Sequence, residues 1–440
     1  MATYVFLNIP AHGHVNPTLA VAHELVQRGE KVIYYLTEEF RAAVEATGAT
    51  FRSYQSQAGQ MQPPTNFNFA QGTRPPNAMP FMVVDEGARV LPQVLESIRA
   101  DRPDYILYDM MCLWAKIAAR SLHVPAILFR PSYAANEQNN IMGNMANGGN
   151  MGGMNPVANS NPALGTVMAA DSAVSSDAGS PPVAPGFLSM FNQVNDKLAE
   201  LCRAYNVEPF SAQEMFLGVE PLTIVFIPKE FQPNGETFDD RFVFVGPSIQ
   251  PRPNTSNFPL DRLTEKTTLY ISLGTVFNNQ AAFYNMCFAA FKDEPWQIVL
   301  STGTKVDQAA LDPIPDNFLV ASQVPQLEVL QHTSLFLTHN GMNSTMESLY
   351  YGVPMVGIPQ MPEQMMTARR VQELKLGTAF DKNALTVELL RTTVEQAMAN
   401  ESYRANAKTM QQHVRNAGGY RRAADAIMKF EQSHRQAART

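Results

Sequence analysis

The start of the chain alternates short apolar runs with a helical pattern, and this alternation constrains the fold more than any other feature. Residues 4–9 and 32–36 are apolar, β-branched runs typical of buried parallel strands. Between them, Asn16 predicts a helix N-cap, Pro17 the first helical position and Gly29 the helix end. A strand, a helix and a strand in succession form a βαβ unit, so we predict a parallel sheet beginning at the N-terminus.

The same alternation continues along the chain and then starts again. Further strands are predicted at residues 105–108, 126–129 and 222–227, with helices at 86–100, 113–122 and 187–205. A second series of strands and helices runs from residue 269 to residue 380, and helices follow it. Because 440 residues are too many for one hydrophobic core, we predict an α/β protein with two doubly wound, Rossmann-like domains.

Three stretches lack this periodicity. Residues 51–82 are rich in Gln, Pro and Asn, which predicts an irregular loop with a strand at its beginning. Residues 136–185 are rich in Asn, Gly, Met, Ser and Ala, and are interpreted either as a flexible insertion or as a mobile lid with a methionine-rich apolar surface. Residues 242–266 carry prolines without periodicity. The predicted bounds are 1–245 for the N-terminal domain, 246–266 for a linker and 267–415 for the C-terminal domain.

Composition limits the possible functions. The apolar fraction of 45% and the charged fraction of 17% are those of an ordinary globular protein. A net charge of -7 without a basic block argues against a nucleic-acid partner. Cys112, Cys202 and Cys287 have neither disulfide nor metal spacing, which favours a reducing compartment. We see no signal-peptide pattern and no apolar run of membrane-spanning length, so we expect a cytoplasmic protein without a membrane span.

The turn after the first strand lacks the glycines of a dinucleotide fingerprint. Residues 11–17 read AHGHVNP, with one glycine and two imidazoles in the space that a pyrophosphate would need. An oxidoreductase is therefore the least favoured function.

His14 and Asp109 both follow predicted strands, at the edge where open α/β sheets place their chemistry. A carboxylate hydrogen-bonded to one imidazole nitrogen raises the basicity of the other, so the pair predicts a general base. No G-x-S-x-G motif supplies a nucleophile, so the base should activate a hydroxyl of the substrate. His12 is a competing base, and a helix-capping role is the structural alternative for His14; spacing does not separate these possibilities.

Residues 335–364 predict an anion site. An apolar strand ends in a glycine-containing turn that opens a helix, which directs backbone N–H groups and the positive helix end at an anion. His339, Asn343 and Ser344 could hold one phosphate, and Thr275, after an earlier strand, another. Without a Walker lysine or an Asp-x-Asp pair, a metal-free diphosphate site stabilised by neutral donors is expected. A capped helix without a ligand is the alternative.

Taken together, these residues resemble the UDP-sugar-dependent glycosyltransferases. The positions that carry the likeness to the donor-binding box are Gln323-Val324-Pro325-Gln326, His339-x-Gly341-x-Asn343-Ser344-x-x-Glu347, Gly352-Val353-Pro354, Pro359 and Glu363-Gln364. The N-terminal GHVNP of residues 13–17 also matches the family. The chain is most similar to bacterial macrolide glycosyltransferases and their relatives, which also act on flavonoids and other phenols. The likeness covers nearly the whole chain and is weakest in residues 136–185.

The resemblance implies a GT-B fold, with two Rossmann-like domains facing across a cleft and a last helix, within residues 416–440, returning to the first domain. It implies that His14 is the catalytic base and Asp109 its partner, and it leaves His12 as a loop residue. The resemblance also implies the donor contacts. Thr275 would contact the diphosphate together with His339, Asn343 and Ser344, which lie in or next to the turn that contains Gly341. Glu347 would contact the ribose, Val324 and Gln326 the uracil and ribose, and Glu363 and Gln364 the hexose hydroxyls.

Two positions depart from the family pattern. Position 323 is usually an aromatic residue that stacks on uracil, and Gln323 gives up a stack worth about 1–3 kcal/mol. Asn340 replaces a small residue, where it either crowds the phosphate or adds a donor, and asparagine tolerates the left-handed backbone of such a turn.

The expected activity is inverting transfer of a hexose, with glucose favoured by the Glu363-Gln364 pair, from a UDP-sugar co-substrate to a hydroxyl of an apolar natural product such as a flavonoid, phenol or macrolide. No other cofactor and no metal are expected, and we expect a monomer or weak dimer. A sugar-nucleotide epimerase is an alternative that the His14–Asp109 pair disfavours. The second alternative is a non-catalytic accessory protein that binds a ligand or partner, and only Gln323 and Asn340 support it.

Overall fold

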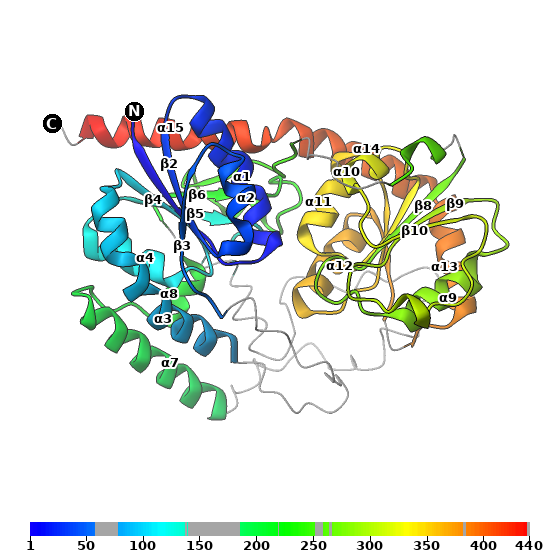
Figure 1. The fold of residues 1–440 in the computed structure, drawn as a ribbon, viewed down its shortest axis with the longest axis horizontal. Helices are drawn as coiled ribbons and strands as arrows, with labels where there is room; N and C mark the ends of the chain where they lie inside the picture. Colours follow the sequence, from blue (N-terminus) through cyan, green and yellow to red (C-terminus); the bar gives the residue numbers. More distant parts are fainter. Residues whose placement is uncertain are drawn as a thin grey trace. The chain divides into compact units, whose positions relative to one another are not determined.

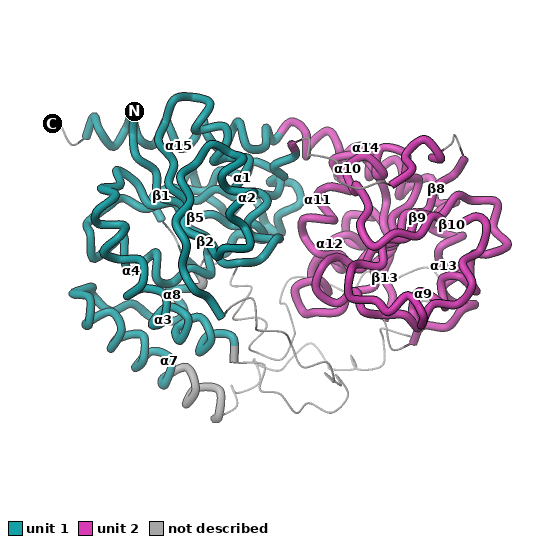
Figure 2. Tube along the Cα trace, in the orientation of Figure 1, with its two compact units in different colours: residues 1–154, 175–249, 417–440 teal, residues 155–174, 250–416 magenta. Residues whose placement is uncertain are grey.

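The computed structural model describes residues 1–57, 78–136, 139, 185–218, 220–250, 258–263, 266–381 and 384–437. These residues divide into two compact units, coloured teal and magenta in Figure 2. The first unit takes its described residues from 1–154, 175–249 and 417–440, and the second from 250–416. Each unit is an α/β domain with a parallel sheet, as the alternating sequence pattern predicts.

The described part of the first unit contains a seven-stranded parallel sheet of order β3-β2-β1-β4-β5-β6-β7. Its strands are β1 (Thr3–Leu7), β2 (Lys31–Leu36), β3 (Thr50–Ser53), β4 (Tyr105–Asp109), β5 (Ala126–Arg130), β6 (Leu222–Val225) and β7 (Phe242–Phe244). The order reverses direction between β1 and β4. Open parallel sheets bind ligands at such a reversal, outside the carboxyl ends of the strands.

Helices cover both faces of this sheet because alternate strand residues point to opposite sides. Val5 and Leu7 of β1 belong to a core with residues of α3 (Ala78–Asp101), α4 (Leu113–Leu122), α7 (Pro185–Ala204) and α8 (Ala212–Leu217). Tyr4 and Phe6 belong to the opposite core, with residues of α1 (His12–Gln27), α2 (Arg41–Glu45) and α15 (Gly419–Ala437).

The last helix, α15, returns the chain to the first unit after the second unit is complete (Figure 1). It packs against α1, and Ala423, Ala424 and Ile427 are fully buried in the core on that face. The hydroxyl of Tyr4 in β1 donates a hydrogen bond to the Glu431 carboxylate of α15. The C-terminal helix is therefore part of the core of the N-terminal sheet.

The second unit repeats the same strand order. Its described strands are β8 (Thr268–Ser272), β9 (Gln297–Ser301), β10 (Phe318–Ala321), β11 (Leu335–Thr338), β12 (Met355–Gly357) and β13 (Gly377–Ala379). They form a parallel sheet of order β10-β9-β8-β11-β12-β13, which reverses between β8 and β11. In the first unit β1 pairs with β4, and in the second unit β8 pairs with β11, so in each unit the first strand in sequence lies beside the fourth.

One face of the second sheet packs against α9 (Ala281–Phe291) and α13 (Val387–Ala399). Tyr270 of β8 and Phe336 of β11 stack with ring centroids 4.6 Å apart, and the Tyr270 hydroxyl reaches α10 (Gln326–Leu330). The remaining helices are α11 (Met342–Tyr350), α12 (Pro362–Glu373) and α14 (Glu401–Asn416), and α11 packs on α14. Within the described part of the chain, no helix combines the length and apolar content that crossing a membrane requires.

The sequence misplaced the start of α1. The helix begins at His12, because the amide N–H groups of His14 and Val15 both donate to the carbonyl of Ala11 at 2.9 Å. Pro17 lies inside the helix and not at its first position. Proline lacks only the N–H that would bond one turn back, and α1 runs through Pro17 with the loss of that one hydrogen bond, so Asn16-Pro17 does not mark the helix start.

Two other local predictions were wrong. Residues 78–82 were expected in an irregular loop but belong to α3, and residues 242–244 form the edge strand β7. The register pairs Thr223 of β6 with Phe242, and an edge position tolerates the prolines that follow. Residues 58–77 of the predicted loop, and almost all of the predicted insertion at 136–185, lie outside the described residues.

The packing of α15 gives the first prediction. Replacement of Ile427 by alanine should reduce the free energy of unfolding of the first unit by about 2–5 kcal/mol, because a fully buried side chain leaves a cavity. Urea unfolding can be followed by the fluorescence of Trp114 in a Trp296→Phe background, since the sequence holds two tryptophans. Lys429→Ala, at an exposed position of the same helix, is the matched control and should change stability by less than about 0.5 kcal/mol. Equal losses of stability in Ile427→Ala and Lys429→Ala would contradict the packing of Ile427 in the core of the first unit.

Candidate active site

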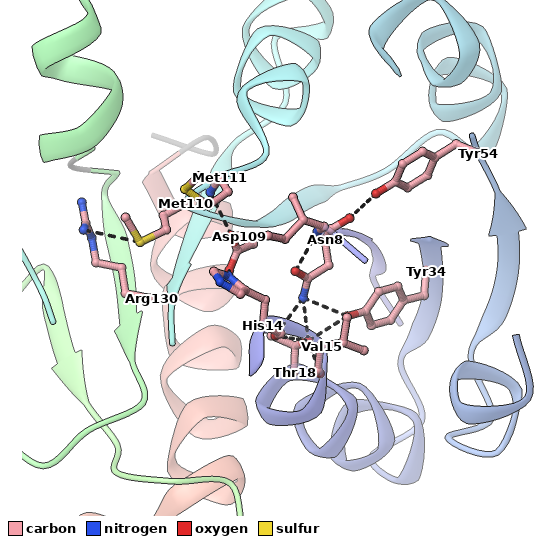
Figure 3. A network of polar contacts seen from close by, with 11 residues as sticks. Asn8, His14, Val15, Thr18, Tyr34, Tyr54, Asp109, Met110, Met111 and Arg130 are labelled. Carbon is pink, nitrogen blue, oxygen red and sulfur yellow. Dashed lines mark hydrogen bonds and ion pairs between the residues drawn. The ribbon is translucent and has the colours of Figure 1, made fainter. Parts of the chain in front are cut away.

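A histidine and a buried carboxylate meet at the reversal point of the first sheet (Figure 3). Asp109 is the last residue of β4, and its side chain is completely buried. His14 lies in the first turn of α1, where 26% of its side chain is exposed. Its Nδ1 lies 2.8 Å from Asp109 Oδ2, and Asp109 Oδ1 accepts a hydrogen bond from the Met111 N–H at 2.8 Å. The carboxylate is therefore fixed from two sides.

The hydrogen bond determines what His14 can do chemically. An ionised carboxylate only accepts hydrogen bonds, so Nδ1 carries the proton and Nε2 is the unprotonated nitrogen of the ring. This is the arrangement of a general base whose ring is oriented by a carboxylate.

His12 has a different environment. It is exposed at the start of α1, and its ring packs edge-on against Phe40, with centroids 4.9 Å apart. Two residues apart in a helix, His12 and His14 point in nearly opposite directions. The structure thus pairs His14, and not His12, with the carboxylate.

The second unit brings His339 close to two backbone segments at its own reversal point. His339 follows β11 directly, and Gly274 follows β8. A Cβ atom at Gly274 would lie 2.5 Å from His339 Cε1, and one at Gly341 would lie 2.4 Å from His339 Nε2. Only glycine leaves room for the ring at both positions. Loss of water around the ring lowers the pKa of His339 to about 4, so at neutral pH this side chain is a neutral hydrogen-bonding group.

The helix after this turn begins without a side-chain cap. Gly341 is the N-cap of α11, and it supplies no acceptor for the N–H groups of the first turn. Asn343 and Ser344, both partly exposed, belong to that first turn. Uncapped N–H groups together with the positive helix end favour an anion at this position.

Asn340 has the left-handed backbone expected for this turn, with φ at +57°. It is completely buried, and a Cβ atom at Gly357 of β12 would lie 1.8 Å from its Oδ1. The amide therefore packs directly on the backbone of the neighbouring strand.

Gln326, Ser344 and Glu347 form one polar cluster. The Gln326 amide nitrogen donates to the Glu347 carboxylate at 2.5 Å and to Ser344 Oγ at 3.4 Å. Its oxygen accepts a hydrogen bond from the Tyr270 hydroxyl at 3.0 Å. Only 5% of Glu347 is exposed. A sugar diol that binds Glu347 would share the carboxylate with Gln326, so the two residues act together.

The other predicted donor residues lie on separate connections of the second unit. Thr275, Gln323 and Glu363 are exposed, Val324 is partly exposed, and Gln364 Oε1 accepts a hydrogen bond from the Gln360 N–H at 2.7 Å. Glu363 and Gln364 belong to the first turn of α12. The second unit also has a hollow of about 400 Å³; Gly303, Thr304, Ile314 and Ser322 are among its lining residues.

Comparison with known proteins identifies the family. The family described as UDP-glucoronosyl and UDP-glucosyl transferase matches residues 224–415. NDP-glycosyltransferase YjiC of Bacillus licheniformis is 37% identical over 428 residues, which cover 96% of both chains. Oleandomycin glycosyltransferase of Streptomyces antibioticus is 30% identical and is matched over 97% of this chain and 90% of its own length. The chain belongs to the UDP-glycosyltransferase family. The crystal structure of CalG4, the calicheamicin glycosyltransferase, superposes with a TM-score of 0.77 at 29% identity and 98% coverage of both chains, which confirms the predicted GT-B fold.

Sequence reasoning missed two polar residues that organise the sites of this glycosyltransferase. Asn8 follows β1 and is 2% exposed, and its amide donates to the backbone carbonyl of His14 at 3.0 Å. Asn278 is 5% exposed and donates to the Gly274 carbonyl at 2.8 Å, which fixes the turn that carries Thr275. For Asn8 the available signal was a polar residue at the carboxyl end of an apolar strand, whereas Asn278 lies well past the end of β8 and gave no comparable signal.

Arg130 is a third residue that the sequence did not single out. It ends β5, is 1% exposed, and donates to the Leu217 carbonyl at 2.9 Å. Burial lowers the pKa of Arg130 to about 10, while the charges of Tyr108 and Asp109 oppose that shift. The guanidinium therefore remains a buried cation at neutral pH, in the electrostatic neighbourhood of Asp109.

His339 gives a prediction on pH dependence. Its pKa is about 4 in the folded protein and 6.5 ordinarily, so between these values the unfolded chain binds a proton that the folded protein does not. Stability should therefore fall as pH drops from about 6.5 to about 4. We expect His339→Gln to lose less stability than the wild type over this range in urea unfolding, with His12→Gln as a control that keeps the wild-type dependence. Parallel pH curves for wild type and His339→Gln would refute the assignment.

Proposed function

We propose that this glycosyltransferase is an inverting enzyme that transfers a hexose, favouring glucose, from a UDP-sugar to a hydroxyl of an apolar natural product. His14, oriented by Asp109, removes the proton from the acceptor hydroxyl as the oxygen attacks the anomeric carbon. The bond from that carbon to the diphosphate breaks, and UDP leaves with the bonding electrons. One displacement of this kind inverts the anomeric centre.

The observation that carries this proposal is the 2.8 Å hydrogen bond between His14 Nδ1 and a completely buried Asp109. It supports a base role because Nε2 is left as the proton acceptor, and because the carboxylate stabilises the imidazolium that forms. No nucleophile motif accompanies the pair in the sequence, which favours direct attack by the acceptor.

The second unit supports binding of a nucleotide diphosphate. A neutral His339, the uncapped start of α11 and Thr275 are suited to a diphosphate that gains charge as it leaves. The Gln326–Glu347 cluster suits a ribose diol, and the exposed Glu363 beside Gln364 suits sugar hydroxyls. We propose that these groups act without a metal ion.

Relatives support a natural-product acceptor but leave the donor open. Two are named oleandomycin glycosyltransferase and demethyllactenocin mycarosyltransferase, and the latter, from Streptomyces fradiae, is 32% identical over 97% of this chain. Their names favour macrolides, beside the flavonoids and phenols that the family resemblance implies. The names of relatives specify different sugars, a mycarosyl group in one and a glucosyl group in another, so UDP-glucose is proposed from the Glu363-Gln364 pair alone. We also propose a cytoplasmic location, because Cys112, Cys202 and Cys287 are buried free thiols.

The direct test is a matrix of donors against acceptors. UDP-glucose, other UDP-hexoses and dTDP-glucose are each incubated with macrolides, flavonoids and simple phenols, and products are detected by mass. A β-glucoside from α-linked UDP-glucose would establish inversion by the anomeric proton coupling. Full activity in excess EDTA would support the metal-free mechanism. Conversion of the UDP-sugar without acceptor would instead indicate an epimerase.

The base pair gives a variant prediction. His14→Ala should lower kcat by about 100- to 10,000-fold, because the proposed proton acceptor is lost, while UDP binding by calorimetry stays unchanged. Asp109→Asn should also lower kcat strongly, since an amide stabilises the wrong tautomer of the ring. His12→Ala, on the opposite side of the helix, is the control and should keep most activity. Full turnover by His14→Ala would overturn the mechanism.

An accessory protein that binds a ligand or partner is the second candidate. Its support is the glutamine at position 323 and the asparagine at position 340, yet the side chain of Asn340 is completely buried and packs on β12. The intact His14–Asp109 hydrogen bond argues for a working enzyme. Absence of UDP binding together with absence of product would favour the accessory role.

Gln323 gives a prediction on donor affinity. Gln323→Trp should tighten UDP binding by about 1–3 kcal/mol if the nucleobase lies on this exposed position, because an aromatic ring stacks on the base. Calorimetric titration with UDP measures the change. Gln323→Leu, an apolar side chain without a ring, is the control and should not reproduce it. Equal affinity of the Trp variant and the wild type would place the base elsewhere.

A further inference from the structure

The first turn of α1, which carries His14, receives little support from its own sequence. Its N-cap, Ala11, has no side chain that accepts a hydrogen bond, and Pro17 lacks the N–H that the helix would use one turn later. His14 must nevertheless hold its ring against Asp109. Contacts from outside the helix are therefore needed to fix this turn.

Asn8 supplies such a contact. It follows the last residue of β1, and its Nδ2 donates to the carbonyl of His14 at 3.0 Å, to Thr18 Oγ1 at 3.1 Å and to the Tyr34 hydroxyl at 3.2 Å (Figure 3). Its Oδ1 accepts from the Ile9 N–H at 2.9 Å, which fixes the orientation of the amide. One buried side chain thus joins the end of β1 to the backbone of His14.

Two hydroxyl groups complete the network. The hydroxyls of Thr18 and Tyr34 lie 2.7 Å apart, and Thr18 donates to the carbonyl of Val15 at 2.8 Å. The Tyr54 hydroxyl donates to the backbone carbonyl of Asn8 itself. Asn8, Thr18 and Tyr34 are at most 2% exposed. Strands β1, β2 and β3 and helix α1 are therefore tied together directly beneath His14.

From this geometry we infer that Asn8 is a positioning residue for the base: it holds the backbone of His14 so that Nδ1 stays on Asp109 and Nε2 stays available to the acceptor. Thr18 and Tyr34 orient the Asn8 amide. The inference rests on the proposed role of His14 as base. Beyond that role, it states that the correct placement of the imidazole depends on Asn8, whose side chain contacts the backbone of His14 and not its ring.

The ionisable groups around His14 allow the effect to be measured. Burial raises the pKa of Tyr34 and of Cys112, so both stay neutral through the range in which a histidine titrates. Arg130 stays cationic and Asp109 is the carboxylate in contact. The acid limb of the pH–rate profile can therefore be assigned to His14, and movement away from Asp109 should shift that limb to lower pH because the imidazolium loses its partner.

The test compares Asn8→Ala and Tyr34→Phe with the wild type. We expect Asn8→Ala to lower kcat roughly 10- to 100-fold, as small misplacements of a catalytic group do, while the KM for the UDP-sugar stays unchanged. The acid limb of the profile should move to lower pH. Tyr34→Phe leaves the ring volume and the Asn8–His14 hydrogen bond intact. It should therefore lower kcat and move the acid limb to lower pH, but by less than Asn8→Ala does. It also keeps the test possible if Asn8→Ala folds poorly.

Tyr4→Phe is the matched control. It removes a buried hydroxyl from the other end of β1, where Tyr4 contacts Glu431. It should lower the unfolding temperature but leave kcat and the pH–rate profile unchanged. A purely structural role of Asn8 predicts the same pattern for Asn8→Ala, with less folded protein and an unmoved acid limb, and that result would overturn the inference.

Titration of His14 by NMR in the absence of substrates separates this inference from the proposed function. We expect the titration midpoint of His14 to fall in Asn8→Ala and to a lesser extent in Tyr34→Phe. A shifted midpoint in a protein that transfers no sugar would support the positioning role while refuting the proposed activity. A wild-type midpoint in both variants would refute the positioning role, whatever the activity.

Discussion

The parallel pairing of β1 with β4, and of β8 with β11, is the constraint on which both sites depend. In the first sheet Leu7 pairs with Tyr108, so the next residues, Asn8 and Asp109, lie side by side at the carboxyl ends of β1 and β4. In the second sheet Ser272 pairs with Thr338, so the residues that follow include His339 and the turn at Gly274. Strand order and register therefore bring together residues that are far apart in the sequence, at the point where helices leave in opposite directions.

The same arrangement serves two different kinds of chemistry. The first unit buries a negative charge on Asp109 and satisfies it with the Met111 N–H and His14, which prepares a proton acceptor. The second unit holds a neutral His339 against two glycines and leaves the start of α11 uncapped. It therefore presents donors without a neutralising carboxylate at that turn, which suits a ligand that brings its own negative charge.

Hydrophobic periodicity was sufficient to predict most elements, because buried parallel strands and amphipathic helices have distinct patterns. The bounds of α4 agree with the prediction to the residue. The short edge strand β7 was missed, since three residues carry almost no periodic signal. Pairing of His14 with Asp109 followed from their strand-end positions, but contacts such as Asn8 to His14 depend on three-dimensional register and are invisible to local patterns.

The choice between His12 and His14 shows how one local error can hide a functional distinction. In a turn, both rings could point toward Asp109, so spacing left them equivalent. Once α1 begins at His12, residues two apart point in nearly opposite directions, and the helix itself separates the base from a surface histidine. The residues alone did not separate His12 from His14 because the helix start was misplaced, and not because the motif lacks the information.

Two buried asparagines near the two sites have opposite energetic roles. Asn8 uses its amide fully, so the network that holds His14 is compatible with a stable core. Within the described residues, neither amide atom of Asn340 has a hydrogen-bond partner, and a buried unsatisfied group costs about 1–3 kcal/mol. Glycine could adopt the same left-handed backbone without that cost. Asn340 therefore costs stability in the turn between β11 and α11, whereas Asn8 adds satisfied hydrogen bonds just after β1.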